Sequence, residues 1–498
     1  MTPKKRQANR HRFASELLST CTVLLLAFLF SLQCSNHLWH TGNIKTDSSV
    51  FYYVARVMAK GGMPYKDTFD HKGPLLYVLN LIGQKIDPWS GIWVVEVLFL
   101  MGAFYLMYRT ARLLCGRPFS IAAVLAAGAL LYEFFDGGNY TEEYALLFIA
   151  GAQYIFADYF LNKKITALRL ILCGAAFGAV LMLRPNMAAL WVVMCLGVLY
   201  QCIRDKEAAN LARFLLLFLA GTLLVCVPFC IWLAAGGAFG EFIECYLKFN
   251  ALYTASTRGD LQTAYRVEAF NFFLRYRIAL IAGCVSVFFS YRSKRLCDVL
   301  HAVFFFASFV FLCISAESYK HYGIVLVPAL IYPFACIGEE AKRKRSRDLM
   351  TVYAALYLLP VLLLPNWLTM ADKAFYDYAT RKQEFYNDCD KDALEVIYEN
   401  SEEGEDFIVC GNWDNLYNLT GRFAVSYYSY QNMPCSLDPA RMDQFFEDVK
   451  KAQPGLIVMA DGSAVEGRMM EYINENHYTE IFRKKYSNFG STIYKKEQ

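Results

Sequence analysis

The sequence predicts a helical protein that crosses a membrane many times and ends in a small soluble α/β domain. Three observations lead to this fold class. The 498 residues are 56% hydrophobic with a mean hydropathy of +0.27. Apolar runs long enough to cross a hydrocarbon layer of about 30 Å recur along the first three quarters of the chain. After Trp367 the composition becomes charged, which is typical of a soluble domain.

Apolar runs of about 17 to 25 residues are the length of a membrane-spanning helix. Eleven such runs are predicted. This count has a margin of two, because the eighth run is short and only Arg184 to Asn186 separate the fifth from the sixth. The expected spans lie near residues 17–36, 91–108, 118–134, 143–161, 168–183, 187–203, 212–235, 278–291, 297–315, 322–338 and 350–368.

Basic residues between the spans predict the orientation of the chain. Connections that stay in the cytoplasm carry an excess of Lys and Arg. Every second connection here has at least three of them: RTARLLCGR, NKKITALR, IRDKEAANLAR, YRSKRLCD and EEAKRKRSRD. The alternate connections GGNYTEE, RPN and AESYKHY have at most one each. We therefore expect a bacterial plasma-membrane protein with a cytoplasmic N-terminus and an extracytoplasmic C-terminal domain.

The predicted domains are a membrane domain over residues 1–370, which includes an outer loop over residues 37–90, and a soluble domain over residues 371–498. In the outer loop, SVFYYVARVMAKGG predicts a helix that begins near Thr46 or Asp47. PLLYVLNLIGQKI is too short to span and predicts a second helix at the membrane surface.

The soluble domain shows alternating helix and strand patterns. Its stretches KDALEVIYENSEE and PARMDQFFEDVKKA favour helices, whereas DFIVCG, PGLIVMAD and STIYKK favour strands. It contains no glycine-rich phosphate loop and no HExxH or GxSxG motif. The modest net charge of +4 gives no reason to expect a nucleic-acid partner.

The outer loop concentrates polar residues in an apolar chain, and Asp47 and Lys72 stand at its two ends. Asp47 suits a helix N-cap, and it equally suits a general base or a metal ligand where a lipid-linked substrate meets water. Lys72 suits a lysine that extends to the membrane surface, or a cation for a phosphate at headgroup depth. Asp70 and His71 either tune the charge of Lys72 or solvate the turn.

Further candidates lie in other loops of the predicted outer face. Glu142 and Glu143 open the fourth span; acidic residues are ordinary there, but a pair beside the membrane is costly to place. Arg184 is an anchor or a ligand for phosphate or sugar. His321 and Tyr322 begin the tenth span, where a structural role is the commoner one.

Several of these residues form a pattern that resembles the first outer loop of the GT-C membrane glycosyltransferases. The pattern comprises Asp47, Tyr52 or Tyr53, Ala55-Arg56, Met58, Gly61-Gly62, Pro64, Lys72-Gly73-Pro74-Leu75 and Tyr77. It is most similar to the branch of protein O-mannosyltransferases and lipid A aminoarabinose transferases. That branch has an Asp-Glu pair and a Lys-Pro-Pro-Leu element, where this chain has Asp47-Ser48 and Lys72-Gly73-Pro74-Leu75. Glu142-Glu143 and His321-Tyr322 before Pro328 resemble later family elements.

The resemblance implies a GT-C-like fold and an inverting glycosyltransferase. The donor would be a sugar linked to polyprenyl phosphate, and the acceptor a surface glycan, a lipid or a protein at the outer face. Asp47 would be the base, and Lys72 with Arg184 would bind the donor phosphate. A divalent metal is compatible with the family, although Ser48 replaces the second acid. The alternative from another class is a transporter or flippase of lipid-linked glycans, against which stands the absence of a visible internal repeat.

Overall fold

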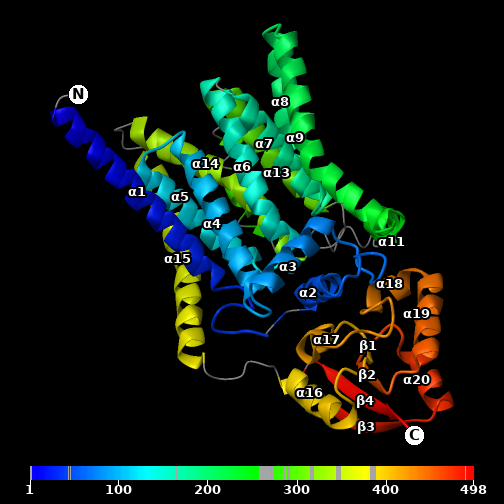
Figure 1. The fold of residues 1–498 in the computed structure, drawn as a ribbon. Helices are drawn as coiled ribbons and strands as arrows, with labels where there is room; N and C mark the ends of the chain where they lie inside the picture. The colour runs from blue at the N-terminus through cyan, green and yellow to red at the C-terminus, as the bar shows by residue number, and fades with distance from the viewer. Residues whose placement is uncertain are drawn as a thin grey trace. The chain divides into compact units, whose positions relative to one another are not determined.

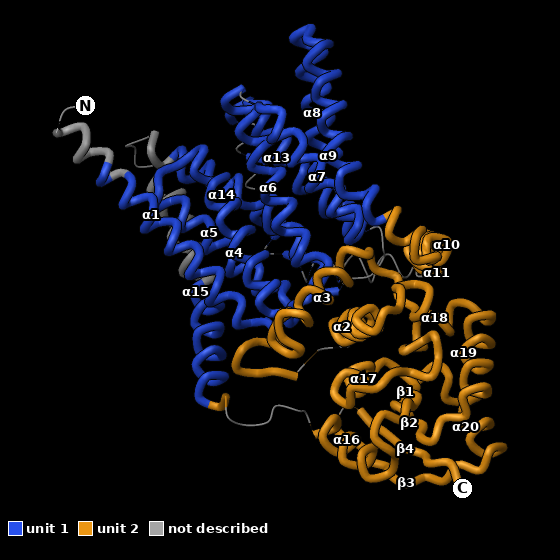
Figure 2. The backbone as a smooth tube through the Cα atoms, in the orientation of Figure 1, with its two compact units in different colours: residues 1–34, 93–229, 257–379 blue, residues 35–92, 230–256, 380–498 orange. Residues whose placement is uncertain are grey.

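The computed structural model describes residues 3–42, 44, 46–163, 165–256, 292–313, 319–343, 349–381, 388–487 and 489–497, and positions 271, 274, 276–277, 279–284 and 287–288. Clustering of contacts divides the chain into two compact units, coloured separately in Figure 2. Unit 1 comprises residues 1–34, 93–229 and 257–379, and unit 2 comprises residues 35–92, 230–256 and 380–498. Each unit is built from segments that are far apart in the sequence.

Unit 1 is helical and contains seven described helices that are long and apolar enough to cross a membrane. They belong to α1 (Pro3–Ser31), α4 (Gly91–Arg112), α5 (Arg117–Phe134), α6 (Thr141–Asn162), α9 (Ala208–Ala235), α13 (Leu296–Cys313) and the run Lys320–Glu340, which joins η3 (Lys320–Val325) to α14 (Leu326–Arg343). These helices coincide with seven of the eleven predicted spans.

The other four predicted spans are not among these seven helices. Helices α7 (Ala167–Leu181) and α8 (Ala189–Arg204) cover the fifth and sixth, are apolar but shorter, and are separated by the turn η1 (Pro185–Met187). Helix α15 (Leu349–Thr380) contains the eleventh. The eighth, near 278–291, is described only at positions 279–284 and 287–288. The predicted fold class, a polytopic helical membrane protein with a small C-terminal α/β domain, is confirmed.

Unit 2 contains a four-stranded sheet in the order β1-β2-β4-β3. Strands β1 (Ile408–Cys410) and β2 (Leu456–Ala460) are parallel, and β4 (Gly490–Lys496) pairs antiparallel with both β2 and β3 (Tyr478–Lys485). Figure 1 shows α16 (Asp388–Asn400) and α17 (Asn415–Thr420) on one side of these strands, and α19 (Pro439–Ala452) and α20 (Glu466–Glu475) on the other. The predicted strands correspond to β1, β2 and β4.

Unit 2 also contains the predicted outer loop. Its two expected helices are α2 (Thr46–Ala59) and α3 (Pro74–Ile86). They share the unit with α10 (Phe239–Phe242), the π-helical turn η2 (Ile243–Lys248), α11 (Phe249–Ser256) and α18 (Asn432–Leu437). By internal contacts, residues 35–92 therefore group with residues 380–498. The functional division into a membrane domain over 1–370 and a soluble domain over 371–498 stays a prediction.

Helix α2 is joined to the C-terminal part of unit 2 through its buried face. Tyr53 belongs to the hydrophobic core formed by α16, α17 and the sheet. Its hydroxyl accepts a hydrogen bond of 3.0 Å from the backbone N–H of Ala424. Arg56, three residues later, donates to the carbonyl oxygens of Tyr417 and Arg422 and lies 4.7 Å from the ring centre of Phe423. These contacts fix the helix that carries Asp47.

Candidate functional site

The turn before α3 is held by two tyrosine hydroxyls. Tyr65 has a φ of 69°, which is unfavourable for a residue with a side chain, and its ring is fully buried. Its hydroxyl donates to the carbonyl oxygen of Lys72 over 2.7 Å. The hydroxyl of Tyr77 accepts from the backbone N–H of Lys72 over 3.0 Å. The backbone at Lys72 is therefore held from both sides.

Asp70 is a buried carboxylate at the centre of this turn, with 2% of its surface exposed. Its Oδ2 accepts a hydrogen bond of 2.7 Å from Tyr77, and its Oδ1 accepts one of 3.0 Å from Tyr430. Burial raises the pKa of Asp70 above its usual value, although the charge of Lys72 and the hydrogen bonds from both tyrosines oppose the rise. Asp70 therefore joins the loop to Tyr430 by a hydrogen bond.

His71 and Lys72 form a short hydrogen-bonded chain with Asn250 of α11. Nδ1 of His71 lies 2.9 Å from Oδ1 of Asn250, and the amide nitrogen of Asn250 donates to the carbonyl oxygen of His71 over 2.7 Å. Because this amide presents its oxygen to the ring, Nδ1 carries the proton. Nε2 then accepts from Nζ of Lys72 at 3.3 Å. A neutral His71 thus orients the ammonium group of Lys72.

Asp47 lies in the first turn of α2 and is exposed, so its carboxylate is accessible to water and solutes. It is near the same tyrosine that binds Asp70. Burial holds the pKa of Tyr430 well above its usual value, and the negative charges of Asp70, Asp414 and Asp47 raise it further. The charges of three carboxylates therefore act on Tyr430. Asp414 is fully buried, and burial raises its pKa to about 7.

Unit 1 holds a second polar cluster around Arg184. Its NH1 forms an ion pair of 2.5 Å with Oε1 of Glu142, and its guanidinium carbon lies 4.2 Å from the ring centre of Tyr322. His321 stacks on Tyr140 with ring centres 4.2 Å apart. Glu142 is 3% exposed and its other oxygen accepts from Thr141. The cluster brings together the loop before α6, the turn between α7 and α8, and η3.

Glu143 points to a different group of side chains than its neighbour Glu142. Its Oε2 accepts from the backbone N–H of Asn139 over 2.8 Å. The ligand atoms of Cys34, Glu96 and Glu143 all lie within 4.8 Å of one another, and all three residues are buried. Oε1 of Glu96 and Oε1 of Glu143 have no hydrogen-bond partner among the described residues. One thiolate and two carboxylates fit a divalent cation such as Zn²⁺.

The predicted site residues thus form two groups. Asp70, His71 and Lys72 are joined by hydrogen bonds in unit 2, where Asp47 and Asp70 lie near the same Tyr430. The other group lies in unit 1 and consists of Glu142, Arg184, His321 and Tyr322. Glu143 is also in unit 1, but its side chain has other partners. The roles that the sequence predicted for these side chains stay predictions.

Sequence reasoning missed several residues of these clusters. Tyr430, Asp414 and Asn250 are far in sequence from the loop that they support, and no local pattern marks them. Glu96 could have been noticed, because an acidic residue inside an apolar span is costly to bury. Cys34 lies near the end of the first predicted span as a single cysteine, which is more often a small buried residue than a ligand.

Solved structures resemble this fold. ArnT from Cupriavidus metallidurans, in a crystal structure bound to undecaprenyl phosphate, matches with a TM-score of 0.60 at 13% identity, over 96% of this chain and 98% of that chain. An oligosaccharyltransferase from Archaeoglobus fulgidus matches in its apo form with a TM-score of 0.52 at 11% identity, over 96% and 74% of the two chains. Its complex with Zn and sulfate gives 0.50 at 15% identity, over 95% and 73%.

These likenesses define the class of the protein as a polytopic membrane protein with a GT-C-like fold. The sequence also assigns the protein to a single family. Residues 8–368 match the family model of the competence-induced protein Ccs4 N-terminal domain, and the chain belongs to this family. No curated protein matches the chain.

Proposed function

We propose that the protein is a glycosyltransferase that moves a sugar from a polyprenyl-phosphate-linked donor to an acceptor at the outer face of a bacterial plasma membrane. The observation that carries the proposal is the likeness to ArnT over nearly the whole length of both chains. The loop motif from Asp47 to Tyr77 supports the same branch of GT-C enzymes. In this orientation the N-terminus is cytoplasmic, and the C-terminal domain is extracytoplasmic.

In the proposed reaction Asp47 is the general base. Its carboxylate accepts the proton of the acceptor nucleophile, such as a hydroxyl group, while the nucleophile forms a bond to the anomeric carbon. The bond from that carbon to the phosphate oxygen breaks, and the electron pair leaves with polyprenyl phosphate. Attack from the side opposite the phosphate inverts the anomeric centre. The exposed position of Asp47 in a fixed helix suits this role.

Lys72 would bind the donor phosphate and stabilise the charge that develops as it leaves. The backbone bonds at Lys72 and the contact with His71 position its ammonium group before any substrate arrives. Arg184 would supply a second cation. No step of the proposed reaction requires a metal ion. A divalent cation held by Cys34, Glu96 and Glu143 would neutralise the negative charge of these buried residues.

The test is sugar transfer by purified protein in reconstituted vesicles, with the lipid-linked donor identified first from lipids that accumulate in a deletion strain. We expect Asp47→Asn to reduce transfer by roughly 10²-fold or more, as is usual for loss of a general base. The matched control is Asp67→Asn, which removes an exposed acid from the same loop and can keep its hydrogen bond to the N–H of Met63. Equal transfer by Asp47→Asn and wild type would contradict the proposal.

The same vesicles distinguish the alternative of a transporter or flippase of lipid-linked glycans. If the protein is a transferase, Asp47→Asn loses sugar transfer, and the translocation of lipid across the bilayer is unaffected. Translocation by the wild type without formation of a glycosylated acceptor, in the presence of donor and a mixed acceptor pool, would favour the alternative.

A further inference from the structure

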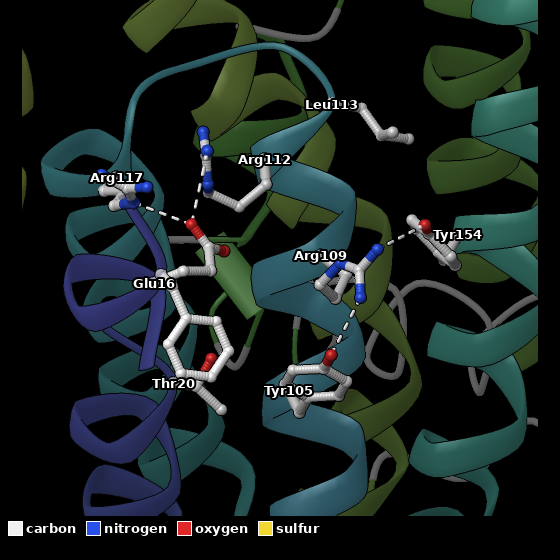
Figure 3. Close-up of a pocket in the computed structure, with 9 residues that line it drawn as sticks. Glu16, Thr20, Tyr105, Arg109, Arg112, Leu113, Arg117 and Tyr154 are labelled. Atoms are coloured by element: carbon white, nitrogen blue, oxygen red, sulfur yellow. Dashed lines mark hydrogen bonds and ion pairs between the residues drawn. The ribbon is translucent and has the colours of Figure 1, made fainter. Parts of the chain in front are cut away.

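Unit 1 contains a polar pocket, lined by α1, α4, α5 and α6, that the proposed reaction does not use. The pocket has a volume of about 600 Å³. Figure 3 shows Glu16 linked to Arg112 and Arg117, and Arg109 linked to Tyr105 and Tyr154. The lining combines polar and charged groups with two apolar side chains; its residues are Phe13, Glu16, Thr20, Tyr105, Arg109, Arg112, Leu113, Arg117 and Tyr154. A volume of this size suits a small molecule or a lipid head group.

The pocket has an excess of positive charge. Three arginines and one glutamate line it, so two positive charges are not balanced by the lining itself. Glu16 is shared between two of the arginines: its Oε2 lies 2.7 Å from Nε of Arg117 and 3.7 Å from NH2 of Arg112. A cation excess in a space of reduced dielectric constant favours an anionic occupant.

Arg109 is the side chain most clearly arranged for such an occupant. Its NH1 donates to the hydroxyl of Tyr105 over 2.8 Å, and its NH2 donates to the hydroxyl of Tyr154 over 2.9 Å. The guanidinium group is thus fixed between α4 and α6 by two neutral oxygens rather than by a carboxylate. Its full charge and its remaining N–H donors therefore stay available for an anion.

The two tyrosine hydroxyls add donors around the same space. Because both tyrosine hydroxyls accept from Arg109, each keeps its own proton for donation. Together these groups form a donor array suited to phosphate oxygens, for which arginine is the preferred side chain.

The position of the pocket indicates where the phosphate comes from. Helix α4 ends at Arg112 and α5 begins at Arg117, so the pocket lies where two membrane helices meet the headgroup layer. Phe13 at its edge and Leu17 one turn later on α1 are 70% and 53% exposed, which provides an apolar surface for an acyl chain. Basic pockets between membrane helices bind anionic lipid head groups.

We propose that this pocket binds the phosphate head group of an anionic phospholipid, with a doubly charged lipid such as cardiolipin matching its charge best. The loop between Arg109 and Arg117 is one of the basic connections that the sequence assigns to the cytoplasm. The pocket shares no residue with the loop that carries Asp47 and Lys72, so the proposal does not rest on the proposed transferase reaction. A bound lipid would join α4 to α5 through its contacts with Arg109, Arg112 and Arg117.

Native mass spectrometry of the full-length protein, released from nanodiscs that contain cardiolipin or phosphatidylglycerol in phosphatidylcholine, tests the proposal. We expect cardiolipin to be retained, phosphatidylglycerol to be retained less, and Arg109→Gln to lower retention about tenfold. The matched control is Arg204→Gln, which removes one charge from another basic connection, where Arg204 pairs with the exposed Asp205. Equal loss of lipid in both variants, or no loss in Arg109→Gln, would overturn the proposal.

Two further arms keep the test decisive. Tyr154→Phe retains the ring and removes one hydroxyl that holds Arg109, so it should lower cardiolipin retention by a smaller factor without unfolding the helix. Inorganic phosphate and glycerol phosphate are added as competitors. Displacement of cardiolipin by either at millimolar concentration would overturn the lipid assignment in favour of a soluble phosphate, whereas retention in their presence supports it.

Discussion

Asp414 shows how burial changes the chemistry of one carboxyl group. Its pKa is raised to about 7 in the folded protein because burial disfavours the charged form, and the charge of Asp70 adds to the effect. In an unfolded chain the value is about 3.9. Between about pH 4 and pH 7 the folded state therefore holds a proton that the unfolded state has lost. Stability must fall as the pH rises through that window.

We expect Asp414→Asn, which stays neutral at every pH, to remove this dependence. Each pH unit in the window costs the wild type up to about 1.4 kcal/mol. The melting temperatures of the two proteins in detergent should be similar near pH 4.5, and the variant should be the more stable from pH 7 upward. A constant difference between them from pH 4.5 to pH 8 would contradict the raised pKa.

Arg184 forms an ion pair with Glu142, and this ion pair competes with the binding of a donor phosphate that the sequence predicts for Arg184. Removing one member of a buried ion pair leaves the other charge uncompensated, at a cost of roughly 3–5 kcal/mol. We expect Arg184→Met and Glu142→Gln each to lower the melting temperature, and the double variant to recover much of the loss. The ion pair of 2.5 Å between them is the reason.

Sugar transfer by the same double variant tests the phosphate role separately from the ion pair. If Arg184 binds the donor phosphate, the folded double variant transfers sugar poorly, and Arg184→Lys retains part of the activity. A stable double variant with the wild-type rate would show that Arg184 serves the ion pair alone.

Single residues of the loop were predictable where polarity itself is the signal. Asp47, Asp70, His71 and Lys72 stand out because polar side chains are costly in an apolar chain. Their partners were not predictable, since Asp70 binds Tyr430 from 360 positions away. Helix geometry explains the separation of Glu142 from Glu143, because adjacent residues of a helix point in different directions. The partners of each side chain were not predictable, since they come from distant segments.

Among the elements, helix α2 carries the strongest link between the loop and the C-terminal part of unit 2. Tyr53 is 3% exposed and packs in the core with α16, α17 and the sheet. We expect Tyr53→Ala to destabilise unit 2 by roughly 3–5 kcal/mol, the usual cost of removing a buried aromatic side chain. Tyr53→Phe should cost less, about 1 kcal/mol, for the lost acceptor of the Ala424 N–H.

Limited proteolysis of the full-length protein measures this effect, with cleavage followed in residues 388–487. The control is Lys60→Ala, at the exposed residue that follows α2. Faster cleavage in Tyr53→Ala than in the control supports the packing role. Equal rates would mean that α2 does not stabilise the C-terminal core.

The elements themselves were largely predictable from periodicity and length. Long apolar runs predicted the long helices of unit 1, and short apolar runs typical of buried strands predicted β1, β2 and β4. Strand β3 was missed because its side chains are mostly exposed and charged, so it lacks the buried apolar pattern that identified the others. It belongs to the sheet through its pairing with β4, which is a tertiary contact.

At the scale of the molecule, the grouping of residues 35–92 with residues 380–498 could not be predicted from the sequence. The contacts that produce it join segments more than 300 positions apart, such as Phe69 N–H to the Tyr427 carbonyl oxygen at 2.9 Å. The family match ends at residue 368, whereas the likeness to ArnT covers 96% of the chain. The C-terminal part therefore belongs to the shared fold, although it is outside the family model.

This grouping changes what removal of the C-terminal domain should do. A domain that only selects the acceptor could be deleted with basal transfer intact. Here deletion of residues 388–498 would uncover Tyr53 and Phe69 and remove the hydrogen bond from Tyr430 to Asp70. We expect the truncated protein to lose sugar transfer and to be cleaved by protease between residues 46 and 72.

Tyr430→Phe separates support of the loop from general unfolding, because it keeps the packing and removes one hydrogen bond. We expect this variant to fold normally and to lose a moderate part of its transfer rate, through less exact positioning of the loop that ends at Lys72. Transfer at the wild-type rate by the truncated protein, with the loop protected from protease, would contradict the support role. It would leave the C-terminal domain as an appendage that the reaction does not need.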